Sequence, residues 1–230
     1  MQTGCDMYFK YGEEALAHLK KDKKLADVID RVGMIEREVD SDLFSAVIHH
    51  IVGQQISTKA QATIGKRFLE RFSKLDAKTI SQASVQDLQS LGMTFKKAQY
   101  ILDFASQVQK GEFPLQKIAT MSDEEAVKTL SSLKGVGVWT AEMLLLFCLQ
   151  RQDIFSFTDL AIVRGIRMLY RHRKVDKALF EKYRRRFSPY GSVASLYLWA
   201  VSGGALPELS DPAPKKKVQK KVSKNLLIKN

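Results

Sequence analysis

The chain has 230 residues and a formal net charge of +12 at pH 7, because 37 lysines and arginines outnumber 25 aspartates and glutamates. This excess favours a polyanionic partner such as nucleic acid over an acidic small molecule, the alternative being a basic surface that serves solubility alone. The sequence has no apolar run long enough for a membrane helix and no secretion signal among its first residues, so we expect a soluble, intracellular protein.

The chain has two cysteines, Cys5 and Cys148, which stand far apart. They are too few for a four-cysteine metal or iron-sulfur site, and a disulfide would be unusual in a reducing compartment. We therefore expect Cys148 to pack in the core.

The first strong helical pattern begins near residue 43, where apolar residues recur at the three-and-four spacing of a buried stripe. Asp40 or Ser41 is placed to cap this helix. Its apolar positions are Leu43, Phe44, Val47, Ile48, Ile51 and Val52. Ser57 can cap the next helix, so residues 53–56 form the turn between the two. The apolar positions of that second helix are Ala60, Ile64, Phe68 and Phe72.

Residues 91–98, Leu-Gly-Met-Thr-Phe-Lys-Lys-Ala, have a single glycine in a context that is typical of a connection between helices. The segment is either a degenerate copy of the glycine turn at 133–141 or an ordinary connection in which Gly92 ends a helix. In either case Lys96 and Lys97 would suit a phosphate.

Helical patterns continue toward the C-terminus. Ser122 and Glu125 have the spacing of a capping box, which predicts a short helix through Leu130. Asp159 can cap a helix that carries an apolar face. That face consists of Ile162, Val163, Ile166, Leu169 and Tyr170. The sequence has no alternating strand pattern of comparable quality, so it predicts an all-α fold.

The glycine turn stands out chemically. Gly135 and Gly137 directly precede the apolar run from Trp139 to Leu149. Such glycines let a tight turn expose successive backbone N–H groups at a helix N-terminus, which favours an anion. Asp159 follows about twenty residues after this turn. Because phosphates raise the free energy of a nearby carboxylate, we expect this residue to have a chemical role.

These residues carry a resemblance to a known family. The pattern Leu-x-Gly-Val-Gly-x-Trp-Thr-Ala at 133–141, with Asp159 downstream, resembles the helix-hairpin-helix (HhH-GPD) DNA glycosylases. Within them it is most similar to 3-methyladenine DNA glycosylase II. Residues 51–57, Ile-Val-Gly-Gln-Gln-Ile-Ser, resemble the segment that wedges into the duplex in that subfamily. The iron-sulfur branch is set aside, because this chain lacks four cysteines near its C-terminus.

The resemblance implies two helical lobes with a central hairpin and a cleft between the lobes, over residues 1–206. Residues 207–230, rich in lysine and proline, should form a disordered basic tail. The expected reaction is hydrolysis of the N-glycosidic bond of alkylated purines such as 3-methyladenine and 7-methylguanine in double-stranded DNA, after base flipping. The expected setting is base excision repair by a monomer, in the nucleoid of a prokaryote or the nucleus of a eukaryote.

Asp159 matches the catalytic aspartate of the family, which would stabilise the sugar cation and orient or deprotonate water. The alternative is a simple helix cap, and both roles can hold together. Some superfamily members use a lysine immediately before the Thr-Ala pair to form a Schiff base and cut the strand. Trp139 stands at that position here. The resemblance therefore implies base removal without strand cleavage.

The base pocket is expected to hold Trp139 and Tyr190, whose rings would attract a cationic base. Met143 and Leu160 stand where the subfamily often has tyrosines, which implies a narrower or shallower pocket. Core packing is the alternative for each ring, and it is favoured for Phe147 and Trp199. His49 and His50 are interpreted as residues on a helix surface, without a catalytic role.

The DNA-binding residues implied by the resemblance fall into two groups. The hairpin group is Gly135, Val136, Gly137 and Thr140, with Lys96 and Lys97 as further candidates. The wedge group is Gln54, Gln55, Ile56 and Ser57. Gln55 or Ile56 would enter the base stack, although a polar turn with Ile56 in the core is the alternative.

No cofactor should be required. A monovalent ion, Na⁺ or K⁺, is possible at the backbone carbonyls of Leu133, Val136 and Val138, as in related hairpins. Two rival functions stay open: a glycosylase for deaminated or oxidised purines, and a non-catalytic DNA-binding module. Asp159 discriminates against the second, because a pure binder gains nothing from a carboxylate that faces the DNA backbone.

Overall fold

The computed structural model describes residues 8–72 and 74–213, and this part of the chain is helical, with one isolated antiparallel bridge between Tyr8 and Glu38 and no strand. The all-α prediction is confirmed. The helices are α1 (Glu13–Leu19), α2 (Lys23–Val32), α3 (Leu43–Gly53), α4 (Thr58–Arg71), α5 (Ala77–Ser81), α6 (Val85–Ser90), α7 (Phe95–Gln109), the 3₁₀ helix η1 (Leu115–Thr120), α8 (Asp123–Leu130), α9 (Val138–Phe147), α10 (Leu160–Tyr170), α11 (Lys177–Phe187) and α12 (Gly191–Gly203).

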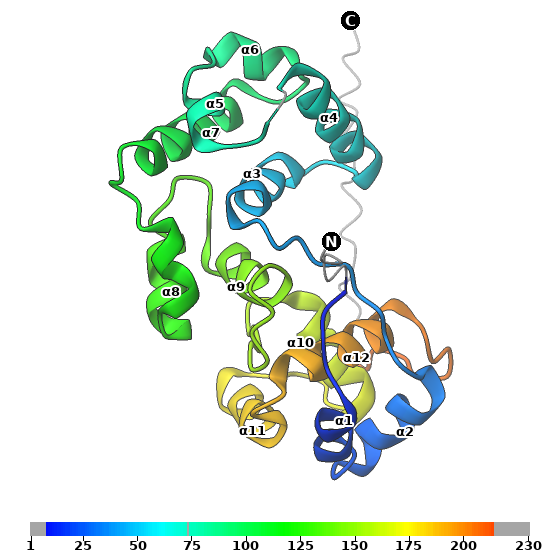
Figure 1. Ribbon diagram of the computed structural model, residues 1–230. Helices are drawn as coiled ribbons and strands as arrows, with labels where there is room; N and C mark the ends of the chain where they lie inside the picture. The colour runs from blue at the N-terminus through cyan, green and yellow to red at the C-terminus, as the bar shows by residue number, and fades with distance from the viewer. Residues whose placement is uncertain (1–7, 73, 214–230) are drawn as a thin grey trace, which may run out of the picture.

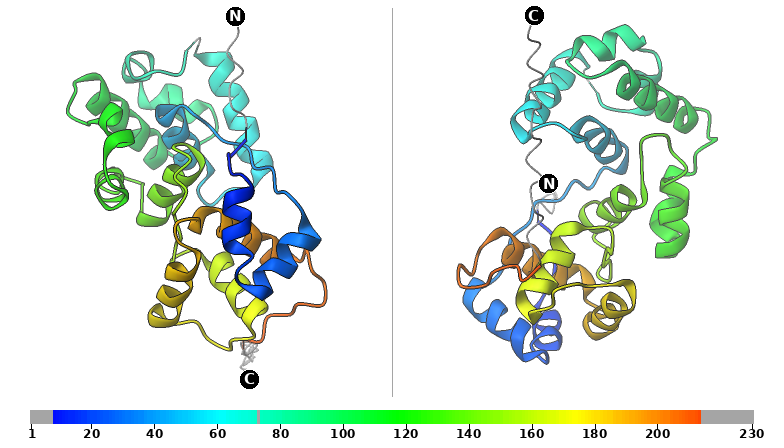
Figure 2. Two further views of the ribbon diagram at one scale, coloured as in Figure 1. Left: turned by 60° about the horizontal axis from the view of Figure 1, so that its bottom comes forward. Right: turned by 180° about the vertical axis from the view of Figure 1, so that it is seen from behind.

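Figure 1 shows two groups of helices, with α3–α7 above and α1, α2 and α10–α12 below. The view from behind in Figure 2 has the same arrangement. Helix α9 lies between the groups and contacts α3, while α10 and α12 form the most extensive helix pair of the lower group. The chain passes from the lower group to the upper group in the segment before α3, and it returns through α8 and α9. Helices α3 and α9 contact each other, so these two connections lie close together.

The two helices α3 and α4 form where the apolar pattern predicts them. Their caps are partly as expected: Ser57 caps α4 by accepting from the N–H of Ala60, but α3 is capped by Asp42 and not by Asp40 or Ser41. The Asp40 carboxylate instead accepts from the N–H of Asp42 at 3.1 Å and contacts Nδ1 of His49 at 3.1 Å. The predicted cap is wrong because the residue directly before Leu43, the first residue of the helix, is Asp42. Asp40 lies farther from the helix N-terminus and pairs with His49 instead.

Two N-terminal helices, α1 and α2, precede the first helix that we predicted. Helix α2 is capped by Asp22 and buries Leu25, Val28 and Ile29 against the lower group. Their three-and-four spacing is the pattern of an amphipathic helix, so its sequence did contain a usable indication.

The Gly92 segment does connect two helices, α6 and α7. Gly92 has φ +108°, a conformation that side chains with a Cβ rarely adopt. Thr94 then caps α7 by accepting from the N–H of Lys97. Gly92 therefore ends α6 in an ordinary connection between two helices, and the interpretation as a degenerate copy of the glycine turn stays a prediction.

The capping box at Ser122 and Glu125 is confirmed, and α8 ends at Leu130 as predicted. Cys148 is buried as expected, and burial raises the pKa of its thiol to about 12. Cys5 lies outside the described residues.

The start of the predicted tail is wrong, since residues 207–213 are part of the fold. Asp211 accepts two hydrogen bonds from the Arg167 guanidinium of α10, at 2.9 and 2.5 Å. A bidentate pair of this kind is among the stronger ion pairs. The remainder of the predicted tail, residues 214–230, lies outside the described residues. Of the helices that the structure describes, none has the length and apolar character needed to span a membrane.

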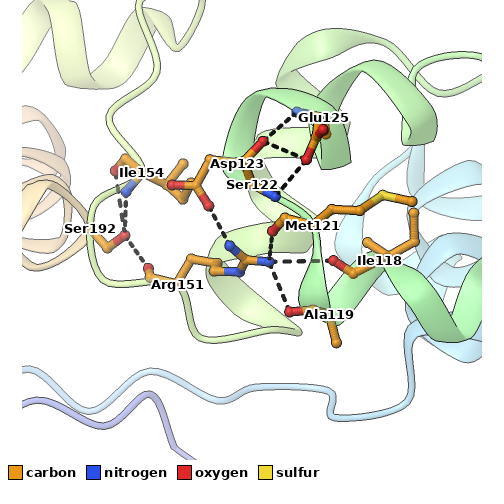
Figure 3. A network of polar contacts seen from close by, with 9 residues as sticks. All are labelled: Ile118, Ala119, Met121, Ser122, Asp123, Glu125, Arg151, Ile154 and Ser192. Atoms are coloured by element: carbon orange, nitrogen blue, oxygen red, sulfur yellow. Dashed lines mark hydrogen bonds and ion pairs between the residues drawn. The ribbon is translucent and has the colours of Figure 1, made fainter.

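Arg151, in the loop after α9, ties that loop to the start of α8 (Figure 3). Its guanidinium lies 2.8 Å from the Asp123 carboxylate and donates to the carbonyl oxygens of Ile118, Ala119 and Met121 at 2.8 to 3.3 Å. Because α8 and α9 flank the glycine turn, this network holds the two ends of the hairpin unit together.

Candidate active site

The glycine turn between α8 and α9 is a tight hairpin. Gly135 has φ +86°, and a Cβ built there would lie 2.5 Å from Cδ2 of Tyr100 on α7. Both the backbone conformation and the close packing therefore require glycine. Leu133 and Val136 are buried and anchor the turn, and the N–H of Val136 donates to the carbonyl of Leu133 at 3.1 Å.

Gly137 serves a different purpose. It has φ −91°, a common conformation, and no described atom lies within 4 Å of a Cβ built there. It is the N-cap of α9, an end that no described side chain caps. The first backbone N–H groups of α9 are therefore open to an anion, as the sequence predicts. Thr140 is buried in the first turn of this helix and does not face solvent.

Asp159 caps α10 and is also a nearly buried carboxylate, 6% exposed. Its Oδ1 accepts from the N–H groups of Ala161 and Ile162, both at 2.9 Å, and from Nε1 of Trp199 at 3.2 Å. Its Oδ2 accepts from Nε1 of Trp139 at 2.9 Å, the one donor to this oxygen among the described residues. The carboxylate is thus fixed in orientation, and Oδ2 keeps acceptor capacity for a further group.

Asp159 opens into a cavity of about 870 Å³. The cavity is lined by Tyr8, Glu36, Arg37, Glu38, Val39, Asp40, Ala46, His49, His50, Trp139, Met143, Leu144, Phe147, Cys148, Asp159 and Trp199. These residues come from the N-terminal segment and the segment before α3, from α3, from α9 and its C-cap, from the N-cap of α10 and from α12.

One wall of the cavity is aromatic. The rings of Phe147 and Trp199 stack with centroids 5.6 Å apart, and the Arg37 guanidinium lies 5.2 Å from the centroid of Phe147. The core packing favoured for Phe147 and Trp199 is confirmed, since both side chains pack against the hydrophobic core, but it is not their whole role. Both line the cavity, and Trp199 also holds Asp159. A surface that already accepts a guanidinium can attract another flat cation.

The wall formed by α3 and the segment before it is ionisable. His49 and Asp40 are paired at 3.1 Å. His50 is partly buried, and burial lowers its pKa. The interpretation as helix-surface residues is confirmed for His49, which is exposed, whereas His50 is only partly exposed. Both also line the cavity.

The four predicted pocket residues do not all meet. Trp139 and Met143 line the cavity, whereas Tyr190 and Leu160 do not. Tyr190 stands at the N-terminus of α12 and packs edge-on against His18. Leu160 directly follows Asp159 and is 82% exposed, because the cap that turns the Asp159 carboxylate inward leaves the next side chain in solvent.

The predicted wedge turn joins α3 to α4. Gln55 has φ +56°, and Ile56 is exposed rather than packed in the core, which removes that alternative. Gln54 points back and donates from Nε2 to the carbonyl of Gly135 at 2.5 Å. The wedge turn and the glycine hairpin are therefore in direct contact.

The two candidate phosphate-binding lysines have different surroundings. Lys96 is exposed, with its ammonium group 5.7 Å from the Tyr100 ring centroid. Lys97 instead donates from Nζ to the carbonyl oxygens of Val52 and Gln54, at 2.8 and 2.6 Å. Burial lowers the pKa of Lys97. Two of the three N–H groups of Lys97 are thus used inside the protein, and a phosphate contact by the third stays a prediction.

Glu142 was missed from the sequence. It lies on α9, its carboxylate accepts from Oγ of Ser156, and that hydroxyl lies 3.0 Å from Oγ1 of Thr158. Burial, together with the negative charge of Asp159, raises the pKa of Glu142. It is the one charged residue in the apolar run from Trp139 to Leu149, a feature that could have drawn attention to it. The network fixes the loop that delivers Asp159.

The monovalent ion at the carbonyls of Leu133, Val136 and Val138 stays a prediction. Clusters of three or more His, Cys, Asp or Glu side chains able to hold a metal are absent from the described part of the chain.

Comparison with known proteins agrees with this geometry. The family model described as HhH-GPD superfamily base excision DNA repair protein matches residues 48–189. The chain belongs to this superfamily. The matched segment runs from within α3 to the start of α12 and so contains the wedge turn, the hairpin and Asp159.

Solved structures of superfamily members share the fold. A Bacillus halodurans DNA-3-methyladenine glycosidase has a TM-score of 0.77 and 27% identity over 88% of this chain and 95% of its own. A Schizosaccharomyces pombe 3-methyladenine DNA glycosylase, solved in complex with abasic DNA, has a TM-score of 0.70 and 26% identity over 83% of this chain and 97% of its own. A Bacillus subtilis DNA-3-methyladenine glycosylase is 29% identical over 173 residues, which are 70% of this chain but 57% of that relative's length.

Proposed function

We propose that this chain is a DNA N-glycosylase that removes alkylated purines, with 3-methyladenine and 7-methylguanine as its substrates. The observation that carries the proposal is the Asp159 carboxylate, which is held by two indole N–H groups at the mouth of an 870 Å³ cavity and beside an uncapped helix N-terminus. The names of the relatives support the same substrate class.

The proposed reaction breaks the bond between deoxyribose C1′ and the base nitrogen. The bonding electrons leave with the base, which neutralises the positive charge that N-alkylation has placed on its ring. A cation develops at C1′, and the Asp159 carboxylate stabilises it electrostatically. A water molecule then attacks C1′ and loses a proton to Asp159 Oδ2, the oxygen with spare acceptor capacity.

Binding would use the surfaces on either side of the cavity. The N–H groups at the start of α9 would hold a phosphate next to the extruded nucleotide, while Gln55 or Ile56 fills the gap in the base stack. The aromatic wall of Trp139, Phe147 and Trp199 suits a flat cationic base, and each well-placed ring would contribute roughly 0.5–2 kcal/mol.

The enzyme would not cut the DNA strand. Trp139 occupies the position of the Schiff-base lysine, and its indole N–H serves to hold Asp159. Lys134, the lysine of the hairpin itself, is paired with Asp103 at 3.1 Å and does not line the cavity. An abasic site with an intact backbone is therefore the expected product.

A second candidate substrate class is the deaminated purines, such as hypoxanthine. It is favoured by one observation, that His49, His50 and Asp40 bring hydrogen-bonding groups to the cavity. Neutral lesions need such groups, because their ring has no charge to attract.

The test is to incubate the protein with duplexes that contain a single 7-methylguanine or a single hypoxanthine, and to measure the free base by mass spectrometry. We expect release of 7-methylguanine and strand breakage only after alkali. Release of hypoxanthine alone would replace the first substrate class by the second. Strand breakage without alkali would contradict the role inferred for Trp139. If the protein released no base from either duplex and none from methylated DNA, the proposed function would be refuted.

A further inference from the structure

The connection of α6 to α7 through Gly92 has no role in the reaction as described. Its most notable contact is that of Lys97, in the first turn of α7. The Lys97 ammonium group donates to the carbonyl oxygens of Val52 and Gln54, the two residues on either side of Gly53, where α3 ends. The last carbonyls of a helix lack partners within the helix, and a cation near them is favourable.

The turn of residues 54–57 is held from two further directions. Gln54 Nε2 donates to the carbonyl of Gly135 in the glycine hairpin at 2.5 Å. Gln61 Nε2, from α4, donates to the carbonyl of His49 at 3.0 Å. The base of the turn is therefore fixed by α7, by the glycine hairpin and by α4, while Gln55 and Ile56 at its tip remain exposed.

We propose that Lys97 is a positioning residue for base extrusion, because it fixes the turn of residues 54–57 against the glycine hairpin so that the side chain filling the duplex enters in register with Asp159. This inference rests on the proposed function. In this role Lys97 acts through the backbone of Val52 and Gln54 and not through the reacting atoms.

A physical reason favours a cation at this place. Without the ammonium group, the carbonyl oxygens of Val52 and Gln54 would lose their partner close to a turn that must approach an anionic backbone. A carbonyl oxygen without a donor would be repelled by a DNA phosphate, or the turn would change conformation so that the oxygen can accept a hydrogen bond from water. Lys97 satisfies both oxygens, so the turn can keep one conformation as it enters the duplex.

The experiment compares Lys97→Met, which keeps most of the length of the side chain but removes its charge, with Lys96→Met as the matched control. Single-turnover release of 7-methylguanine is measured from a fully paired duplex and from a duplex in which the lesion lies in an unpaired bubble. A 2-aminopurine next to the lesion reports its extrusion by fluorescence. Thermal unfolding of each protein shows that it is folded at the assay temperature.

We expect Lys97→Met to slow release from the paired duplex roughly tenfold, the size of one hydrogen bond from a charged group, and to lower the 2-aminopurine signal. Release from the bubble should change less than about twofold, because the lesion there needs little help to leave the stack. Lys97→Arg should recover most of the duplex rate. Lys96→Met should weaken binding on both substrates alike, with a smaller dependence on salt concentration.

Equal losses on paired duplex and bubble would overturn the inference, and so would a Lys97→Met protein that behaves like Lys96→Met. If Lys97→Met does not fold, Gln54→Ala carries the test, since it removes the tie to Gly135 but leaves the Lys97 contacts in place; it should show the same loss confined to the paired duplex. Failure of the proposed function is distinguishable, because the unaltered protein would then release no base from either substrate.

Discussion

Replacing Gly135 with alanine tests whether the glycine hairpin is required by backbone geometry. At φ +86°, a left-handed conformation, alanine is less stable than glycine by about 1–2 kcal/mol. The new Cβ would also lie 2.5 Å from Cδ2 and 3.0 Å from Cε2 of Tyr100. Since Tyr100 packs against the core, its ring would have to leave its rotamer, at roughly 1 kcal/mol more. We therefore expect Gly135→Ala to lower the free energy of unfolding by about 2–3 kcal/mol.

Thermal unfolding measures this effect. A loss of that size corresponds to a fall in Tm of roughly 5–10 °C for a domain of this length. Gly137→Ala is the control, because Gly137 has φ −91° and no described atom lies within 4 Å of a Cβ there. Its Tm should match that of the parent. A Gly135→Ala protein that melts within about 1 °C of the parent would refute the reasoning.

Three further predictions follow from side chains around the cavity and the hairpin. Trp139→Phe keeps an aromatic ring but removes the 2.9 Å bond to Asp159, so single-turnover base release should slow roughly tenfold with little change in KM; an unchanged rate would contradict this role. Burial lowers the pKa of His50, so the unfolded chain binds its proton more readily and the protein should lose stability as the pH falls below about 6.5 and through the lowered value. His50→Gln should remove that part of the loss between pH 7.5 and 5.5 in thermal unfolding, and identical pH slopes would argue against it. Arg151→Met should lower the unfolding free energy in urea by about 2 kcal/mol, because three carbonyl oxygens lose their donor; an unchanged midpoint would mean that water replaces the guanidinium.

The parts of the fold that local chemistry determines could be predicted from the sequence. Ser57, Ser122 and Asp159 are caps because their side chains satisfy N–H groups two or three residues ahead, which a short pattern reveals. Gly135 is recognisable for the same reason, since its conformation is a local requirement. Asp42 was missed in favour of its neighbours because the start of a helix is the least certain part of an apolar pattern.

The walls of the cavity could not be derived in this way. Trp199 lies 40 residues after Asp159 and bonds to it only because α12 packs against α10. Its position within an apolar helix is indistinguishable from that of a core residue. For Tyr190 the error is the opposite one. The family resemblance predicted that it lines the pocket, but it stands at the start of α12 and packs against His18.

The role of a charged residue can be equally hard to predict from sequence, as Lys97 shows. Next to Lys96 in the sequence, it looks like another solvent-exposed cation, yet its partners are carbonyl oxygens more than forty residues away on α3. Backbone acceptors have no identity in a sequence, so contacts of this kind become visible only in three dimensions.

The replacement Asp159→Asn tests the central claim most directly. Asparagine caps a helix about as well as aspartate and has the same shape, so Oδ1 can still cap α10 while the negative charge beneath the sugar is lost. The amide nitrogen cannot accept from Trp139, so thermal unfolding is measured to show that the variant is folded at the assay temperature. In single-turnover release of 7-methylguanine from duplex DNA, we predict a rate at least about 100-fold below that of the parent, with DNA binding retained. A folded Asp159→Asn protein that releases the base at the parental rate would contradict the account.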